Sequence, residues 1–153
     1  MKKTIKFKLN GEARTCEVEP ADILLDVLRD RLGAKGPKYG CGRGDCGTCT
    51  VLIDGKSARS CLMLAVEVDG HEVTTVEGLS KDKLSRLQAS LLKNNSFQCG
   101  FCAPGIMMTA TELLNKNPNP NLEEVQEAIA GNLCRCTGYE PIVKGILEAT
   151  KKG

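Results

Sequence analysis

The stretch that most constrains the fold of this chain is the loop from Cys41 to Cys49, which carries three cysteines at the spacing C-x4-C-x2-C. A fourth cysteine, Cys61, follows after a short strand pattern. Glycines stand at positions 40, 42, 44 and 47. A loop that wraps a metal centre must adopt positive φ angles and bring backbone N–H groups close to sulfur atoms, and a Cβ would obstruct both. We therefore expect the surrounding chain to be a scaffold that holds these thiols together.

The spacing of the thiols distinguishes two kinds of metal site. Four cysteines in this pattern are the ligand run of plant-type [2Fe–2S] ferredoxins. A structural zinc site also uses four thiolates, but it usually takes them from two separate C-x2-4-C pairs. Because three thiols lie in one glycine-rich loop, the pattern favours an iron–sulfur cluster over zinc.

The remaining cysteines indicate the compartment. Eight of the nine fall into two groups, 41–61 and 99–136, and Cys16 is left over. The two separate groups favour two small domains. An odd count of cysteines in tight groups is typical of metal ligation in a reducing compartment rather than of disulfides, so we expect a cytoplasmic protein. No secretory signal is readable after Met1, and no apolar run approaches the ~18 residues of a membrane span. The net charge of +2 and the 3% aromatic content indicate neither a strongly basic surface nor an aromatic stacking surface for nucleic acid.

The first half of the chain has the patterns of a sheet crossed by one helix. Alternating apolar residues on both sides of Asn10-Gly11 predict a β-hairpin, with Cys16 on its apolar phase as a small hydrophobic residue. Apolar residues at helical spacing from Ala21 to Leu32 predict an amphipathic helix that Asp22 can cap.

Further strand patterns follow the cysteine loop. Residues 50–53, an Asp54-Gly55 turn and a return strand deliver Cys61, and residues 62–66 and 73–76 flank a turn at Asp69-Gly70. This order matches a β-grasp ferredoxin. The single histidine, His71, is expected to be an exposed turn residue rather than a ligand.

After residue 77 the apolar period changes from two to about 3.6, which predicts an all-helical half. Four short helices are expected: one marked by leucines between 84 and 92, one begun by Pro104, one capped by Asn121 and one opened by Pro141. The predicted fold class is therefore α+β. A ferredoxin-like β-grasp domain over residues 1–77 precedes a four-helix bundle domain over residues 78–153.

The turns of the helical half carry the second group of cysteines. Cys99 and Cys102 form a C-x2-C turn between the first two helices, and Cys134 and Cys136 form a C-x-C turn between the last two. Two turns at one end of a bundle can present four thiolates to one site. A lone C-x2-C is shared by redox dithiols and zinc knuckles, but the βαβ context of a thioredoxin-like dithiol is not present here.

Segments 40–51, 98–105 and 131–139 together resemble the small iron–sulfur subunit of the xanthine oxidase family of molybdenum hydroxylases. That family includes xanthine, aldehyde, nicotinate and carbon monoxide dehydrogenases and 4-hydroxybenzoyl-CoA reductase. The resemblance covers essentially the whole chain. Its departures, Arg43, Thr48 and Ala103 in place of frequent family residues, touch no cysteine position.

The resemblance implies two ligand sets and a cofactor contact. The outer [2Fe–2S] cluster would be held by Cys41, Cys46, Cys49 and Cys61. The inner cluster would be held by Cys99, Cys102, Cys134 and Cys136. Gln98 and the Cys136 segment would lie against the molybdopterin cofactor of a partner.

The resemblance also implies the function. The chain would be the electron-transfer, iron–sulfur subunit of a molybdenum-containing oxidoreductase, relaying electrons between the molybdopterin centre and FAD. Its partners would be a large molybdopterin-binding subunit and a medium FAD-binding subunit, in a heterotrimer or its dimer. The chain itself offers no catalytic motif: it has no dinucleotide fingerprint, no phosphate loop and no nucleophile–base pair. Substrate chemistry is therefore expected on a partner.

Two other functions compete with this one. A free-standing two-cluster ferredoxin would need a charged docking face and a stable monomer, and isolation of native partners separates it from a subunit. A zinc-stabilised interaction module would be colourless, so visible absorbance separates it from both iron–sulfur alternatives.

Overall fold

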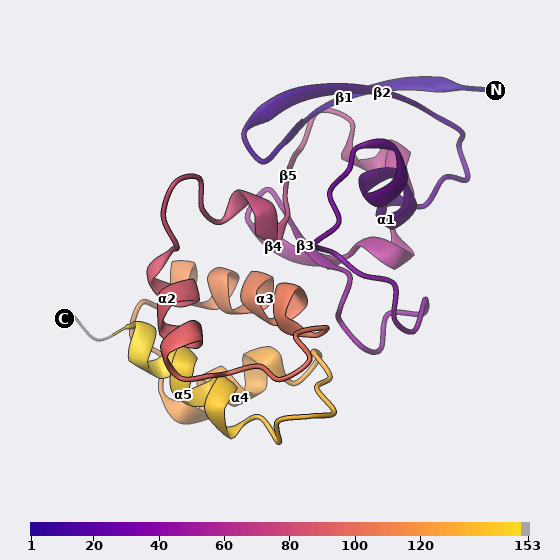
Figure 1. Ribbon diagram of the computed structural model, residues 1–153. Coiled ribbons are helices and arrows are strands. Elements are labelled where there is room, and N and C mark those ends of the chain that lie inside the picture. The colour runs from indigo at the N-terminus through magenta and orange to yellow at the C-terminus, as the bar shows by residue number, and fades with distance from the viewer. Residues whose placement is uncertain (151–153) are drawn as a thin grey trace.

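The computed structural model describes residues 1–150, which form a mixed α and β structure built on a five-stranded sheet (Figure 1). The strands in chain order are β1 (Lys3–Leu9), β2 (Glu12–Val18), β3 (Thr50–Ile53), β4 (Lys56–Arg59) and β5 (Glu72–Thr74). Their order in the sheet is β2-β1-β5-β3-β4. The only parallel pairing in this sheet joins β1 to β5, and the remaining neighbours are antiparallel.

Both predicted hairpins are present. Asn10 and Gly11 have φ angles of 53° and 82°, which are the positive values that a tight hairpin turn requires. Cys16 pairs with Ile5 across this hairpin and is half-buried against the core of the sheet, as its apolar phase predicted. The second hairpin, β3 and β4, reverses the chain at Asp54 and returns it toward the cysteine loop.

The expected amphipathic helix is shorter than predicted and changes its winding. It begins as α1 (Leu24–Asp26) and continues into a π-helical turn, η1 (Val27–Arg31), in which the N–H of Leu32 bonds the carbonyl of Val27 at 3.1 Å. Asp22 does not cap it. The Asp22 carboxylate instead accepts hydrogen bonds from the Glu19 N–H at 2.8 Å and the Arg31 guanidinium at 2.7 Å, and Ile23 occupies the N-cap position.

The strand expected at residues 62–66 is wrong. This stretch contains two 3₁₀ turns, η2 (Ser60–Leu62) and η3 (Ala65–Val68), with one isolated bridge from Leu64 to Ile23. The reason is that Ala65 and Val68, three residues apart, are the buried positions, whereas Leu62 and Leu64 stay exposed. Burial at that spacing suits a 3₁₀ turn and not the two-residue period of a strand.

The four predicted helices of the second half are all present. They are α2 (Arg86–Lys93), α3 (Ala103–Lys116), α4 (Leu122–Ile129) and α5 (Glu140–Ala149). Asn121 caps α4 by accepting the Glu124 N–H at 2.9 Å, as predicted. Ser85 caps α2, so Leu84 precedes the helix and is exposed. No helix within residues 1–150 combines the length and apolarity needed to cross a bilayer.

Helix α3 is the element that joins the two halves. It contacts β3 and β4 on one side and α2 and α4 on the other, and Figure 1 shows it between the sheet and the remaining helices. Ile106, Met108 and Ala110 in its middle are fully buried. Because α3 begins directly after Cys102, its packing also places the second group of thiols beside the first.

Candidate metal centres

The cysteine loop aims backbone N–H groups at its own sulfur atoms. The N–H of Cys46 lies 3.4 Å from Cys41 Sγ, and the N–H of Cys41 lies 3.4 Å from Cys46 Sγ. The N–H of Arg43 adds a contact to Cys41 Sγ at 3.5 Å. The N–H groups of Arg43 and Cys46 lower the pKa of the Cys41 thiol to about 6, because they stabilise the thiolate. This half of the first site is thus prepared for an anionic sulfur ligand.

The other two thiols of the first group form a buried pair. Cys61 follows β4 in η2 and meets Cys49, and both pack against Leu25. Burial, followed by the interaction with Cys49, raises the pKa of Cys61 to about 11. A metal must displace that proton, since only thiolates ligate.

Glycines leave the room that this loop requires. Gly42 and Gly44 have φ angles of 68° and 87°, which side-chain-bearing residues rarely adopt. A Cβ at Gly40 would stand 2.7 Å from Cys46 Sγ. The donor set, the N–H groups and the space around the sulfurs fit an iron–sulfur cluster.

The second group of thiols also meets in pairs. Cys99 Sγ and Cys136 Sγ are 3.6 Å apart and exposed, whereas Cys102 is buried against Cys134. Burial, with a further contribution from Cys134, raises the pKa of Cys102 to about 12. At Cys134 burial opposes the thiolate, but hydrogen bonds from Thr137 and the Cys136 backbone outweigh it and lower the pKa. The Thr137 hydroxyl lies 3.1 Å from Cys134 Sγ.

The eight cysteines thus converge as four pairs, two in each half of the chain. The pairs are Cys41 with Cys46, Cys49 with Cys61, Cys99 with Cys136, and Cys102 with Cys134. Four thiols gathered in each half of the chain are the number that one [2Fe–2S] cluster requires.

Gln98 and Cys136, both singled out from the sequence, lie together. The Gln98 side-chain amide donates to the carbonyl of Cys136 at 3.1 Å, although the two residues are 38 positions apart in the sequence. Both residues are exposed. This edge of the second site is therefore open to a partner molecule.

Tyr139 is a site residue that sequence reasoning missed. Its φ angle of 71° is unusual for a bulky residue, and its phenol oxygen accepts the N–H of Cys134 at 2.8 Å. The sequence feature that could have indicated it is the position of this tyrosine, directly after Gly138 and just before the helix that Pro141 opens.

His71 is exposed as expected, but its Nδ1 lies 2.6 Å from an Asp54 carboxylate oxygen, a partner that the sequence did not reveal.

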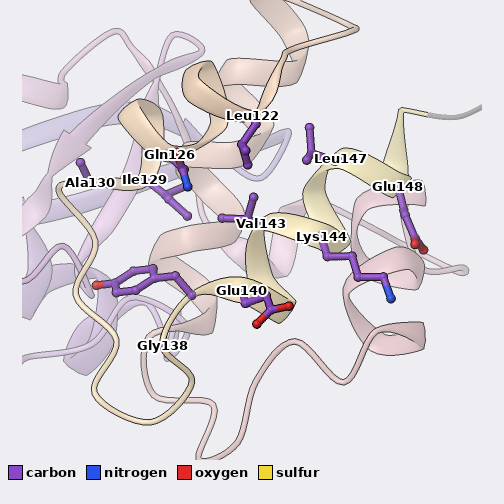
Figure 2. A pocket seen from close by; sticks show the side chains of 11 residues that line it. Leu122, Gln126, Ile129, Ala130, Gly138, Glu140, Val143, Lys144, Leu147 and Glu148 are labelled. Carbon is purple, nitrogen blue, oxygen red and sulfur yellow. The ribbon is translucent and has the colours of Figure 1, made fainter.

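A separate groove of about 880 Å³ runs between α4 and α5 (Figure 2). Leu122, Val143 and Leu147 form much of its apolar floor, and Lys144 and Glu148 lie at its edge. None of the eight paired cysteines lines it. The groove and the thiol sites are distinct features of the surface.

Comparison with known proteins identifies the two halves independently. Residues 7–80 match the 2Fe-2S iron-sulfur cluster binding domain, and residues 75–147 match a [2Fe-2S] binding domain. The chain is 50% identical to the nicotine 6-hydroxylase small subunit of Paenarthrobacter nicotinovorans, over 95% of this chain and 88% of that protein. It is 45% identical to the nicotinate dehydrogenase small FeS subunit of Eubacterium barkeri, over 97% and 96%.

A solved structure gives the same result. A chain of quinoline 2-oxidoreductase from Pseudomonas putida 86 superposes with a TM-score of 0.95 at 48% identity, covering 97% of this chain and 93% of that one. Together, the matches define an iron–sulfur protein with two [2Fe–2S] binding domains. The chain belongs to the small iron–sulfur subunits of the xanthine oxidase family of molybdenum hydroxylases, and it is the electron-transfer component of an oxidoreductase complex.

Proposed function

We propose that this chain relays electrons between a molybdopterin centre on a large partner subunit and FAD on a medium partner subunit. The observation that carries the proposal is the convergence of eight thiols as four pairs in two neighbouring sites. A [2Fe–2S] cluster, when bound, supplies one-electron oxidation and reduction. The chain's own residues bind, orient and partly bury the redox centres.

The proposed ligand sets divide between the two sites. The first set is Cys41, Cys46, Cys49 and Cys61. The second set is Cys99, Cys102, Cys134 and Cys136. In each set one pair is more buried than the other, which excludes water from one side and leaves the opposite side near the surface.

We further propose a division into two domains, a β-grasp ferredoxin-like domain over residues 1–77 and a four-helix domain over residues 78–153. The strands all precede residue 75, and α2 to α5 all follow residue 85. The two family matches also change over between residues 75 and 80. These observations support a boundary near residue 77.

The order of the sites along the electron path is also a proposal. The second set would form the inner relay beside molybdopterin, because Gln98 and Cys136 are exposed, bonded to each other and available to a partner. The first set would then form the outer relay toward flavin. Exposed apolar side chains near both sites, including Tyr39, Leu62 and Leu133, suit burial against other subunits.

The names of similar proteins support the proposed partner set. Similar proteins are named as the gamma subunit of caffeine dehydrogenase and the beta subunit of a 6-hydroxypseudooxynicotine dehydrogenase complex. We therefore propose a heterotrimer, or its dimer, in the cytoplasm. Purification of the native complex and identification of its chains tests this composition.

Metal content tests the ligand assignment. Two sets of four thiols predict about four irons and about four acid-labile sulfides per chain. Cys16→Ser should leave both values unchanged, because Cys16 lies opposite Ile5 in the sheet and belongs to none of the four thiol pairs. About two irons per chain, with one set of thiols freely alkylated, would contradict the two-cluster proposal.

Ligand variants test the order of the relay. Cys46→Ser should block flavin reduction by substrate while the second site still accepts an electron. Cys102→Ser should prevent electrons from substrate from reaching both the first site and the flavin. Rapid-freeze EPR and rapid-scan absorbance in the assembled complex distinguish these outcomes. Reduction of the first site in the Cys102 variant, with the second site oxidised in the Cys46 variant, would reverse the order.

A further inference from the structure

The two thiol sites meet at a joint where three backbone segments touch. The segments are Cys46–Gly47 in the first cysteine loop, Gly105 in α3, and residues 131–133 before Cys134. A Cβ at Gly47 would stand 2.5 Å from the carbonyl oxygen of Gly131, and a Cβ at Gly105 would collide with the carbonyl oxygen of Gly47. The N–H of Leu133 donates to the carbonyl of Cys46 at 2.8 Å. The joint is thus packed backbone against backbone, with no room for side chains from these glycines.

One polar side chain fills the centre of this joint. Asn132 is 1% exposed, and its amide nitrogen donates to the carbonyl of Gly47 at 3.0 Å and contacts the Thr50 hydroxyl at 3.4 Å. The Thr109 hydroxyl, on α3, donates to the Asn132 amide oxygen at 2.8 Å. The orientation of the amide is fixed chemically, because the carbonyl of Gly47 only accepts and must face the NH₂ group.

Asn132 therefore connects all three segments at once. Gly47 directly follows Cys46 and lies two residues before Cys49, while Asn132 lies two residues before Cys134. Its side chain spans from the first thiol loop to α3, whose first turn follows Cys102. A displacement of Asn132 would move one ligand loop relative to the other, because the connection on each side is only one or two residues long.

A second contact lies at the edge of the same joint. The guanidinium of Arg59 donates to the carbonyl of Gly131 at 2.8 Å and to the Thr50 hydroxyl at 2.6 Å. Arg59 is half-buried, whereas Asn132 is enclosed. A buried amide with every partner in place rigidifies its surroundings more than an accessible charge, because an unpaired buried group is costly.

We propose that Asn132 is a positioning residue that fixes the separation and orientation of the two redox sites relative to each other. The inference rests on the proposed function, since it takes the two cysteine sets as the two cluster sites. Asn132 touches no proposed ligand sulfur; it acts through Gly47 on one loop and through the backbone of Leu133 on the other. Its role is to set the electronic coupling between the sites and not to hold either one.

The test compares variants that change the joint but leave all eight thiols in place. Asn132→Asp keeps the shape but replaces the NH₂ donor with a carboxylate oxygen that faces the carbonyl of Gly47. Thr109→Val removes the hydroxyl that orients the amide. Thr111→Val is the matched control, because it removes a hydroxyl from the same helix that bonds only the carbonyl of Met107, at 2.7 Å.

Each full-length chain is purified in its assembled complex and fully reduced with dithionite. Iron content reports whether both sites are filled, and low-temperature EPR reports the magnetic interaction between them. We expect Thr109→Val to keep the wild-type iron content but to change or lose the splitting caused by the neighbouring site. Asn132→Asp should change it further, and Thr111→Val should leave it as in the wild type.

Other outcomes would overturn the inference. Unchanged splitting in both Asn132→Asp and Thr109→Val, with full iron content, would show that the joint does not set the coupling. Loss of iron from Thr109→Val would show that the network holds an individual site and not the distance between sites. A wild-type complex with only one set of iron would instead overturn the proposed function, and this inference with it, before any variant is compared.

Discussion

The phenol oxygen of Tyr139 accepts a hydrogen bond from the backbone N–H of Cys134 at 2.8 Å, and the phenol donates another to the carbonyl of Asn132 at 3.1 Å. The ring thus closes the turn that carries two of the second group of thiols. Tyr139 holds a left-handed backbone conformation, with φ at 71°, which costs a side-chain-bearing residue about 1–2 kcal/mol. The two hydrogen bonds of the phenol and the packing of the ring against the helical core contribute to offsetting this strain.

Tyr139→Phe should weaken the second site selectively. It leaves the Cys134 N–H and the Asn132 carbonyl without their partner, which costs about 1–3 kcal/mol where the groups are shielded from water. We expect faster loss of iron from the second site on mild chelation, with the first site retained. EPR of the reduced protein separates the two signals. Tyr39→Phe is the matched control, because Tyr39 is 55% exposed, and its iron retention should equal that of the wild type.

Thr48→Ala should lower the reduction potential of the first site. The Thr48 hydroxyl lies 3.4 Å from Cys46 Sγ and 3.0 Å from the carbonyl of Lys38. A ligating thiolate only accepts hydrogen bonds, and donors to cluster sulfurs raise the potential. Loss of a contribution of about 1 kcal/mol corresponds to roughly 40 mV for a one-electron couple. An EPR-monitored redox titration measures the shift, and Thr48→Ser should preserve the potential. An unchanged midpoint in Thr48→Ala would show that the hydroxyl bonds only to Lys38.

Gly105→Ala should destabilise the contact between the halves. The added methyl group would collide with the carbonyl oxygen of Gly47, and overpacking of this kind costs about 1–3 kcal/mol. The expected fall in melting temperature is roughly 3–10 °C. Gly55→Ala provides the comparison, because its Cβ meets nothing within 4 Å and only its φ angle of 81° is unfavourable. A smaller fall in melting temperature for Gly105→Ala than for Gly55→Ala would show that the backbone around Gly105 shifts to accommodate the added methyl group.

Asp22 should make the sheet half sensitive to acid. The hydrogen bond from Arg31, followed by that from the Glu19 N–H, holds the pKa of the Asp22 carboxyl below its ordinary value. A carboxyl whose pKa is lowered by folding stabilises the fold above its unfolded pKa of about 4, and that stabilisation is lost as the pH falls through the folded pKa. When melting temperature is measured as a function of pH, Asp22→Asn should therefore show a smaller fall at acid pH, the acid limb of the curve, than the wild type. Asp30→Asn, which removes an exposed carboxylate 3.7 Å from Lys35, should retain the wild-type limb.

Local features of the fold were readable from the sequence because their causes are local. Asn10-Gly11 and Asp54-Gly55 turn the two hairpins, and Asn121 caps α4, through contacts within a few residues. The prediction was wrong at residues 62–66 and imprecise at Asp22. The two segments shape each other: the N–H of Ala65 donates to the carbonyl of Asp22 at 2.7 Å, although the two residues are 43 positions apart in the sequence. Periodicity cannot report such a contact.

By itself the sequence determined the chemistry of this protein, since cysteine spacing and glycine placement specify thiol ligands in loops that can adopt positive φ angles. The two sets of four thiols were also expected from the sequence, whereas tertiary structure alone decided which thiols pair within each set and how the two sites are related. Cys99 meets Cys136 across 37 positions, and Asn132 meets Gly47 across 85. These relationships depend on the packing of α3 between the sheet and the other helices. That packing is the sum of many weak contacts, and it leaves no motif or periodicity in the sequence of the segments that it brings together.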